Sequence, residues 1–250
     1  MLFYFTATGN SLFIARQLDE DPMSIPQILK QVDLVFEDET IGIVAPVYAG
    51  ELPPIVRRFL AKATFKADYM YMVLTYGMND SVAGEWGYCY CKSQKINMDY
   101  IHTIKMVDNY TPSFDVDEQK KMDKHIDEQL EVIKKELNER KSFIPHPTDD
   151  GREKYDFVTR KPLNVNNGEQ ITVTDKCIGC GICTRVCPVG RFEVINKKAV
   201  RKQNTCEFCL ACLHSCPQKA IITCLSDINP NARYRHESIT LQDIIKSNQQ

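Results

Sequence analysis

Short apolar runs separated by helical patterns fill the first 141 residues of the chain. The runs at 2–5, 41–47 and 69–74 are nearly continuous, as in parallel strands that are covered on both faces, and 100–107 is a plausible last strand. Strands that alternate with helices predict an α/β layer fold with a parallel sheet. The pattern of residues 81–98 does not decide between a helix and a loop.

Helical spacing lies between these runs and after them. Residues 11–18 repeat apolar side chains at helical intervals, and a proline opens the helix predicted at 54–65. Residues 116–141 carry a single apolar stripe on an otherwise charged surface, which predicts one long helix lying on the outside of the protein.

The periodicity is lost in residues 142–171, where prolines, glycines and paired asparagines indicate a connector. The connector also holds aromatic side chains, so we expect an ordered arm between two domains. The predicted division is therefore a first domain at 1–141, the connecting arm at 142–171, a cysteine-rich domain at 172–226 and an extension with a short helix at 227–250.

Composition excludes several classes of protein. The 31 Lys and Arg residues nearly balance 33 Asp and Glu residues, so the net charge of −2 argues against a basic nucleic-acid-binding protein. No apolar run is long enough to span a membrane, and the first residues lack the cationic segment of a secretory signal. We therefore expect a cytoplasmic protein, in which structural disulfides are rare. The 11 cysteines then need another explanation.

The cysteines form an internal repeat. Cys177, Cys180, Cys183 and Cys187 are followed by a proline, and Cys206, Cys209, Cys212 and Cys216 repeat the same spacing and the same proline. This run of three close cysteines and a more distant fourth is the bacterial two-cluster pattern, in which each fourth cysteine ligates the other cluster. Zinc is the competing interpretation, but structural zinc sites use two separated pairs.

The spacing predicts two ligand sets that cross between the copies. A tight loop can offer three thiolates to one iron–sulfur cube, whereas the fourth cysteine has entered a helix and points away. One cluster is expected to use Cys177, Cys180, Cys183 and Cys216, and the other Cys206, Cys209, Cys212 and Cys187. Such a unit has little core of its own and depends on its metal for folding.

Residues 172–225 resemble the bacterial ferredoxin with two 4Fe–4S clusters. The resemblance implies an α+β domain and rests on the two cysteine runs. The first copy departs from the pattern after its fourth cysteine. Its Pro-Val-Gly-Arg-Phe lacks the Ala-Ile continuation that follows Pro217, which suggests a reshaped segment near one cluster.

The second chemical signal is the loop from Thr6 to Ser11, between the first strand and the first helix. Its residues Thr6, Thr8, Gly9, Asn10 and Ser11 supply hydroxyls, an amide and a close backbone approach, and the helix N-terminus attracts an anion. No lysine or arginine lies in the loop, so we expect neutral recognition of one phosphate. The alternative is an ordinary N-capped helix after a strand.

Two further loops favour a flavin. Tyr48 and Ala49 follow the run at 41–47, and Tyr76 and Gly77 follow the run at 69–74. In a doubly wound parallel sheet of order 2-1-3-4-5, the loops after strands 1, 3 and 4 converge where FMN binds. The ring is expected to lie between the two tyrosines, with its phosphate on the first loop.

Residues 1–141 resemble a flavodoxin, and the two halves together resemble the flavodoxin–ferredoxin fusion proteins of anaerobes. The loop Thr6-Ala-Thr-Gly-Asn-Ser11 and the cysteine runs match best. The resemblance implies FMN and electron transport. One departure is the absence of a tryptophan at 46–50, since the only tryptophan is Trp86, which offers an alternative stacking partner.

We therefore expect an electron-transfer flavo-iron–sulfur protein that passes low-potential electrons between two 4Fe–4S clusters and FMN. Its partners would be redox proteins. The alternative is an FMN-dependent reductase of a small molecule, with the aromatic stretch 84–91 as a pocket wall. A redox sensor, which binds its partner in one oxidation state only, ranks third. No catalytic residue is assigned.

Other polar and thiol residues favour structural roles. Cys89 and Cys91 are too few for a metal site and are expected to be packed or surface thiols. His214 lies within the second cysteine run, where an exposed helix position is favoured over a role beside a cluster. The basic stretch at 197–202 predicts a solvated hairpin, and a docking patch for an acidic redox partner is the alternative.

Overall fold

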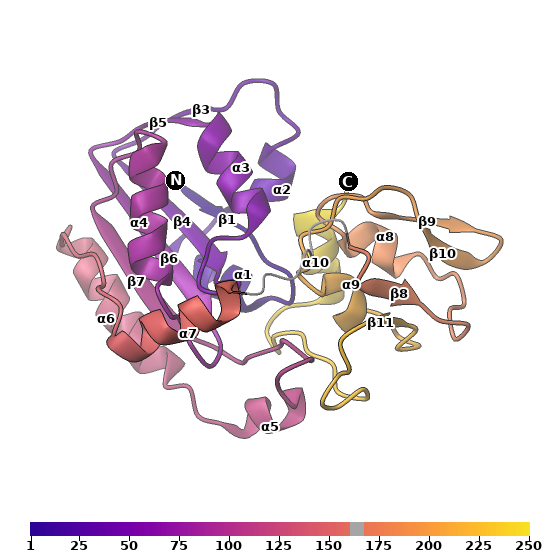
Figure 1. The fold of residues 1–250 in the computed structure, drawn as a ribbon. Coiled ribbons are helices and arrows are strands. Elements are labelled where there is room, and N and C mark those ends of the chain that lie inside the picture. Colours follow the sequence, from indigo (N-terminus) through magenta and orange to yellow (C-terminus); the bar gives the residue numbers. More distant parts are fainter. Residues whose placement is uncertain (161–167) are drawn as a thin grey trace. The chain divides into compact units, whose positions relative to one another are not determined.

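Figure 1 shows the fold in a computed structural model, which describes residues 1–160 and 168–250. The described residues divide into two compact units. The sheet unit contains Met1–Phe5, Ser11–Met106 and 124–160, and the cysteine unit contains Thr6–Asn10, Val107–Asp123 and 168–250. The loop after the first strand thus clusters with the cysteine unit, whereas the domain boundaries expected from the sequence stay a prediction.

A five-stranded parallel sheet forms the centre of the sheet unit, in the order β2-β1-β4-β6-β7. The strands are β1 (Leu2–Tyr4), β2 (Met23–Ser24), β4 (Thr40–Pro46), β6 (Tyr69–Tyr76) and β7 (Tyr100–Lys105). Numbered within the sheet, this is the order 2-1-3-4-5, so the predicted flavodoxin-like α/β fold is confirmed. β2 has only two residues, which is too short for an apolar run to reveal.

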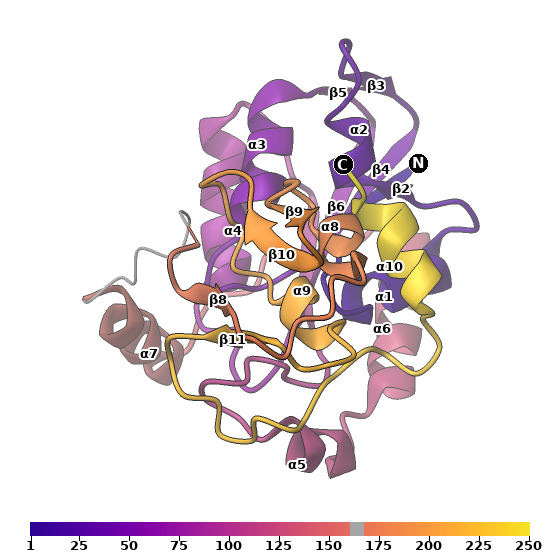
Figure 2. The ribbon, with the colours of Figure 1, turned by 90° about the vertical axis from the view of Figure 1, so that its right-hand side faces the viewer.

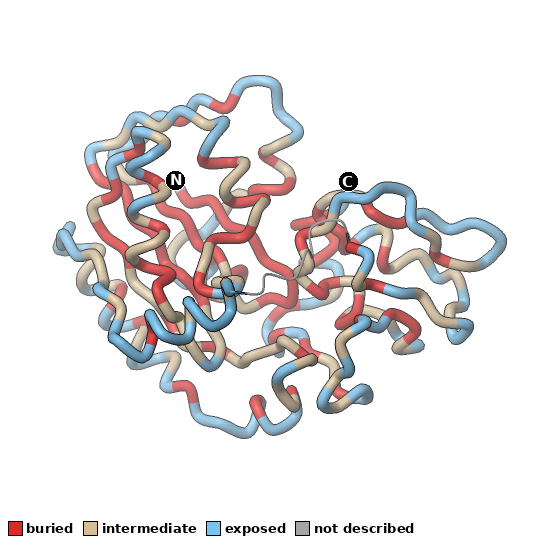
Figure 3. Tube along the Cα trace, in the orientation of Figure 1, coloured by how far each residue is buried: buried red, intermediate tan, exposed pale blue. Residues whose placement is uncertain are grey.

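Helices cover both faces of this sheet. α3 (Pro54–Lys62) and α4 (Ala83–Ser93) lie on one face, and α1 (Asn10–Leu18) and α6 (Ile126–Asn138) lie on the other (Figures 1 and 2). Right-handed crossovers between parallel strands produce this arrangement. Figure 3 shows the consequence, because the central strands are buried while the outer faces of the helices are exposed. The continuous apolar runs of the sequence are thus strands covered twice.

The long helix expected at 116–141 is wrong, because the structure has two helices there. α5 (Val116–Lys121) begins at Asp115, whose side chain accepts a hydrogen bond from Asp117 N, and α6 begins after His125. His125 has a left-handed φ of 50°, and the Gln129 side chain donates to the carbonyls of Lys124 and His125. The break divides the stripe, so that α5 belongs to the cysteine unit and α6 to the sheet unit.

Two more segments of the sheet unit differ from the sequence expectation. α3 ends at Lys62, and β5 (Thr64–Lys66) then pairs in parallel with β3 (Val35–Glu37), where Phe65 stacks on Phe36. The undecided stretch 81–98 forms α4, whose buried face consists of Ala83, Gly84, Gly87 and Cys91. These small side chains let the helix approach the sheet closely. The aromatic residues of the stretch 84–91 lie on the other, half-buried side of this packed helix.

The connector contains a helix that its prolines and glycines did not predict. α7 (Asp149–Thr159) is capped by Thr148, whose side chain accepts a hydrogen bond from Gly151 N. Pro162, Leu163, Asn166 and Asn167, which belonged to the same expectation, lie outside the described residues. The remaining short helix of the sheet unit is α2 (Ile25–Ile28).

The cysteine unit is built from small elements. Its two-stranded sheets pair β8 (Ile171–Val173) with β11 (Ile221–Thr223), and β9 (Phe192–Ile195) with β10 (Lys198–Arg201). Its helices are α5, α8 (Ile182–Val186), α9 (Ala211–His214) and α10 (Leu241–Asn248). The β9–β10 hairpin carries the basic stretch, as expected, and α10 starts at a capping box of Thr240 and Asp243. No helix among the described residues is long and apolar enough to cross a membrane.

Candidate functional site

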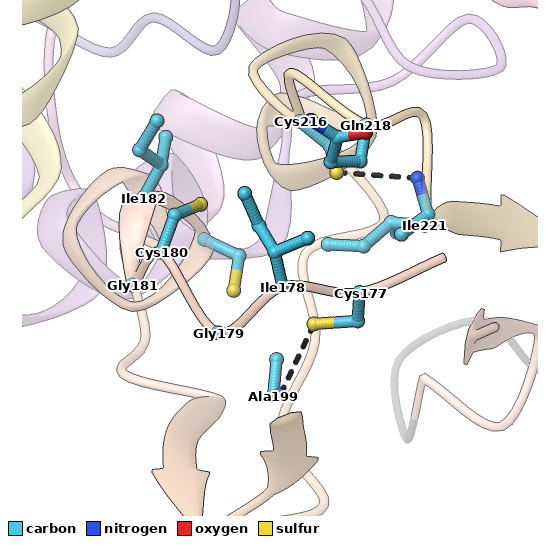
Figure 4. Close-up of a pocket in the computed structure, with 12 residues that line it drawn as sticks. Cys177, Ile178, Gly179, Cys180, Gly181, Ile182, Ala199, Cys216, Gln218 and Ile221 are labelled. Atoms are coloured by element: carbon cyan, nitrogen blue, oxygen red, sulfur yellow. Dashed lines mark hydrogen bonds between the residues drawn. The ribbon is translucent and has the colours of Figure 1, made fainter. Parts of the chain in front are cut away.

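Four cysteines from both copies of the repeat line one cavity of about 350 Å³. They are Cys177, Cys180, Cys183 and Cys216, here called the first cysteine set (Figure 4). The first two lie in the loop between β8 and α8, the third lies in α8, and the fourth follows α9. Ile178, Ile182 and Ile221 supply apolar lining. The structure therefore brings together the residues that the crossed spacing grouped.

The other four cysteines line a second cavity of about 310 Å³. This second cysteine set comprises Cys206, Cys209, Cys212 and Cys187. Cys187 is the C-cap of α8, and Cys212 lies in α9. Each set thus takes three cysteines from one copy and one from the other, as the sequence grouped them. Among the described residues, no three histidine, cysteine, aspartate or glutamate side chains converge closely enough to hold a single metal ion.

Backbone amides donate to the sulfurs of both sets. Ala199 N and Ala220 N lie 3.3 and 3.2 Å from the Sγ atoms of Cys177 and Cys216. In the second set, Arg191 N and Phe208 N lie 3.3 Å from the Sγ atoms of Cys187 and Cys206. Hydrogen bonds to sulfur favour a thiolate and modify the potential of a metal group bound to it.

The loops that present the sulfurs require left-handed backbone conformations. Gly179 and Gly181 have φ values of 68° and 74° in the first copy, and a Cβ on Gly179 would lie 2.6 Å from the backbone of Lys197. The equivalent residues of the second copy are Phe208 and Leu210, at φ of 48° and 58°. Non-glycine residues adopt this region at a cost. The second copy therefore keeps the same loop shape under more backbone strain.

Burial strongly affects the thiols. It raises the pKa of Cys183 to about 12, together with a smaller effect of negative charge on Cys177, Cys180 and Cys216. Burial also raises the pKa values of Cys209 and Cys212 well above the usual value of a thiol. These cysteines therefore become thiolates only when a cation compensates their charge, which is what a metal group supplies.

The phosphate loop expected at Thr6–Ser11 is buried. Thr6, Thr8 and Ser11 are at most 4% exposed. Gly9 N donates to Thr6 Oγ1 at 3.0 Å, and Asn109 Nδ2 donates to Thr8 Oγ1 at 2.8 Å. Within the sheet unit, Ser11 shares a 2.8 Å hydrogen bond with Thr75. The hydroxyl and amide groups of this loop fit the chemistry of a phosphate.

The C-terminal extension covers the same loop within the cysteine unit. His236 N donates to Thr8 O and Asn248 Nδ2 donates to Thr6 O, both at 2.9 Å. Tyr234 donates its hydroxyl to Asn10 Oδ1 at 2.6 Å. A Cβ on Gly9 would lie 2.9 Å from His236 Cβ, so the extension packs directly on the glycine. The hydroxyl and amide groups of the loop suit a phosphate, but residues of the C-terminal extension pack directly on the loop.

The predicted ring contacts lie in the sheet unit. Tyr48 and Ala49 form a tight turn after β4, in which Ala49 has a left-handed φ of 54° and Tyr48 pairs with Glu51. Tyr76 ends β6 and is half-buried, and Gly77 follows it. Trp86, the alternative stacking partner, packs against Tyr90 in α4 with ring centroids 5.3 Å apart. The nine predicted flavin contacts are therefore divided between the two units.

His214 is a correction to the sequence analysis, because it is buried rather than exposed. Its Nδ1 accepts from Tyr234 N at 3.1 Å, so its Nε2 carries the proton and donates to Asn109 O at 2.8 Å. Burial lowers its pKa to about 4, which keeps the ring neutral. Sequence reasoning missed this residue because its partners lie 105 and 20 positions away. Cys89 is exposed and Cys91 is buried.

Comparisons with known proteins agree with the cysteine geometry. A family model of 4Fe–4S dicluster domains matches residues 170–217. The ferredoxin of Methanothermococcus thermolithotrophicus is 42% identical over 50 residues, which cover 83% of that protein and 19% of this chain. In this segment, the chain belongs to the 4Fe–4S dicluster ferredoxin family. Ferredoxin-2 of Desulfomicrobium norvegicum is 60% identical over 30 residues, covering 51% of that protein and 12% of this chain.

Other similarities are more partial. One component of the ion-translocating oxidoreductase complex of Methanosarcina acetivorans is 47% identical over 45 residues, and the chain spans only 17% of its length and matches over 18% of its own. Among solved structures, the rubredoxin oxygen:oxidoreductase from Desulfovibrio gigas matches 52% of this chain and 35% of that chain, at 13% identity and a TM-score of 0.32. The flavodoxin-like assignment of the fold follows from the strand order of the central sheet.

Proposed function

We propose that this chain is an electron-transfer protein that binds two 4Fe–4S clusters, one in each cysteine set. The observation that supports this most directly is the crossed grouping, in which Cys216 completes the first cavity and Cys187 the second. A bound cluster supplies one-electron oxidation and reduction. A site that takes three closely spaced cysteines from one copy and one from the other suits a cube better than one zinc ion, because structural zinc sites use two separated pairs.

The surrounding residues would hold the clusters and exclude water. The four amides that donate to sulfur fix the orientation of Cys177, Cys216, Cys187 and Cys206. Isoleucine side chains close the first cavity, and Phe192, Phe208 and Leu210 line the second. This enclosure lowers the local dielectric and limits the access of water to a bound cluster.

Iron and sulfide analysis tests the proposal. Protein purified without oxygen should contain about eight irons per chain. Cys216→Ser and Cys187→Ser should each remove about half of them, from different sets. Cys224→Ser is the matched control, because Cys224 is exposed and lines neither of these cavities, and it should keep full iron content. Stoichiometric zinc without acid-labile sulfide would refute the assignment.

We further propose that the loop Thr6–Ser11 binds the phosphate of FMN. The loop leaves the carboxyl end of β1, beside β4, at the edge of the sheet where flavodoxin-like folds bind their ligand. Thr8, Asn10 and Ser11 are the residues that would hold the phosphate, and Tyr48 and Tyr76 would flank the ring. Because residues 234–239 and Asn248 cover the loop, binding requires that this extension move away.

Flavin extraction and an FMN titration test this second proposal. Asn248→Ala removes the side chain that donates to Thr6 O, so it should tighten FMN binding as measured by quenching of flavin fluorescence. Gln242→Ala changes an exposed residue of the same helix and should leave the affinity unchanged. Flavin that neither co-purifies nor binds to any of these variants would contradict an FMN site.

For the partners, we propose cytoplasmic redox proteins that dock at the basic β9–β10 hairpin. Lys198 is partly exposed and pairs with Asp175 at 2.7 Å, while Arg201 and Lys202 are exposed. Complementary charge increases the encounter rate more than the affinity. Exchange with an acidic partner protein should therefore slow at high salt, and a rate independent of salt would count against this surface.

A further inference from the structure

The two cavities differ in charge. Apart from their cysteines, the described residues that line the first cavity include no charged side chain. The second cavity is lined by Arg191 and Glu207, and these two side chains are 2% and 3% exposed. A buried charge acts through a low dielectric and is screened far less than a surface charge. The same redox group would therefore experience a different field in each set.

Arg191 occupies a position that the repeat itself defines. It follows Cys187 by four residues, and Ala220 follows Cys216 by four residues. Both residues donate their backbone N–H to the sulfur of that cysteine, at 3.3 and 3.2 Å. The backbone is thus equivalent in the two copies, and only the side chain differs. The reshaped segment after Pro188 therefore introduces a cation where the other copy has a methyl group.

The guanidinium is held firmly beside the second set. Its Nη2 donates to Gly168 O at 2.6 Å, and its Cζ lies 5.5 Å from the centroid of the Phe192 ring. Gly168 is needed for this placement. A Cβ there would lie 2.3 Å from Arg191 Nη1 and 2.8 Å from Cys206 Cβ, so the guanidinium and Cys206 border the same small space.

We propose that Arg191 gives the second cysteine set the higher reduction potential of the two, with Glu207 opposing it in part. This rests on the proposed function, namely that both sets bind a 4Fe–4S cluster. When one electron passes from the first set to the second, the donor site is oxidised, the acceptor site is reduced and gains one negative charge, and no proton is required. A buried cation stabilises the added negative charge. Electrons would then reside on the second set.

The test is an anaerobic potentiometric titration with dithionite, followed by EPR, on protein whose iron and sulfide content shows both sets filled. The wild type should give two midpoint potentials. Arg191→Gln should lower the upper midpoint potential and narrow the separation between the two midpoints. Arg191→Lys should retain most of that separation. Glu207→Gln should shift the upper midpoint upward and widen the separation. The two midpoints need no prior assignment, because the substitutions move the same one in opposite directions.

Lys198→Gln is the control, since the side chain of this lysine is 43% exposed and pairs with Asp175, whose side chain is fully exposed. It should leave both midpoints in place. If Arg191→Gln leaves both midpoints unchanged, or shifts both equally, the assignment is wrong. If that variant loses iron, Glu207→Gln decides, and an unchanged or lowered upper midpoint overturns the proposal. Wild-type protein with about half the iron expected for two clusters would instead refute the proposed function.

Discussion

The interiors of the two units are filled with different kinds of atoms. In the sheet unit, β4 and β6 are buried along almost their whole length, and apolar side chains pack on both faces. In the cysteine unit, one buried cluster contains Ile171, Phe192 and Leu213 together with Cys183, and four more cysteines pack against it. The first interior is complete as a hydrophobic core. The interior of the cysteine unit is small and contains several cysteine side chains in place of larger apolar ones. We therefore expect the stability of this unit to depend on bound metal.

Removal of the metal should produce the largest difference in stability between the two units. Chelation under reducing conditions should unfold the cysteine unit, because structural metals contribute on the order of 10 kcal/mol in small metal-dependent domains. Hydrogen exchange should then show loss of protection in β8, β11, α8 and α9, while the amides of β4 and β6 stay protected. An equal loss of protection in both units would mean that the apolar core of the sheet unit does not stabilise it independently of the metal.

The converse substitution lies in the core of the sheet unit. Phe59 is fully buried, and its ring centroid lies 5.0 Å from that of Phe3 and 5.6 Å from that of Phe65. Phe59→Ala should cost about 3–5 kcal/mol of unfolding free energy in denaturant titrations, through lost burial and a cavity. Phe157→Ala, at a ring 79% exposed, is the control and should cost little. Iron content should be unchanged in both variants. A loss of iron with Phe59→Ala would show that the cysteine unit depends on the core of the sheet unit.

A third substitution asks how much of the cysteine unit depends on polar contacts. His214→Phe keeps a buried ring but leaves Asn109 O and Tyr234 N without the hydrogen bonds that the imidazole makes. We expect a loss of about 2 kcal/mol, since each buried group left unpaired costs about 1–3 kcal/mol. His125→Phe, at an exposed position, is the comparison. An unchanged thermal midpoint in metal-loaded His214→Phe would show that the metal alone holds this unit together.

The sequence revealed those parts of the molecule that local patterns determine. The central strands were visible because strands covered on both faces are continuously apolar, and the cysteine groups were visible because their spacing is fixed by one loop shape. The helix break at His125 was not visible, because the apolar stripe continues through it. α5 ends at Met122, whose backbone is extended, and α6 starts after the left-handed His125. Neither backbone change alters the hydrophobic pattern.

Contacts between distant residues were the other gap. The cover over the loop Thr6–Ser11 depends on Asn248, which lies 242 positions from its acceptor Thr6, and Arg191 reaches Gly168 across 23 positions. Polar side chains of this kind look like surface residues in the sequence. A partial signal existed for Arg191, since the missing Ala-Ile continuation marked the segment as unusual without indicating that a charge would be buried there.

The smallest expected effect concerns one hydroxyl in each unit. Tyr234→Phe removes the hydrogen bond to Asn10, and Tyr69→Phe removes a 2.7 Å hydrogen bond to Lys141 O in the sheet unit. Each should cost about 1 kcal/mol, the usual net value of a hydrogen bond. Their local consequences should differ, because Tyr234 holds the extension over the loop at Thr8, whereas Tyr69 belongs to a central strand. Hydrogen exchange at His236 N, which donates to Thr8 O, should speed up only in Tyr234→Phe. If it speeds up in neither variant, the extension is held by packing on Gly9 rather than by this hydroxyl.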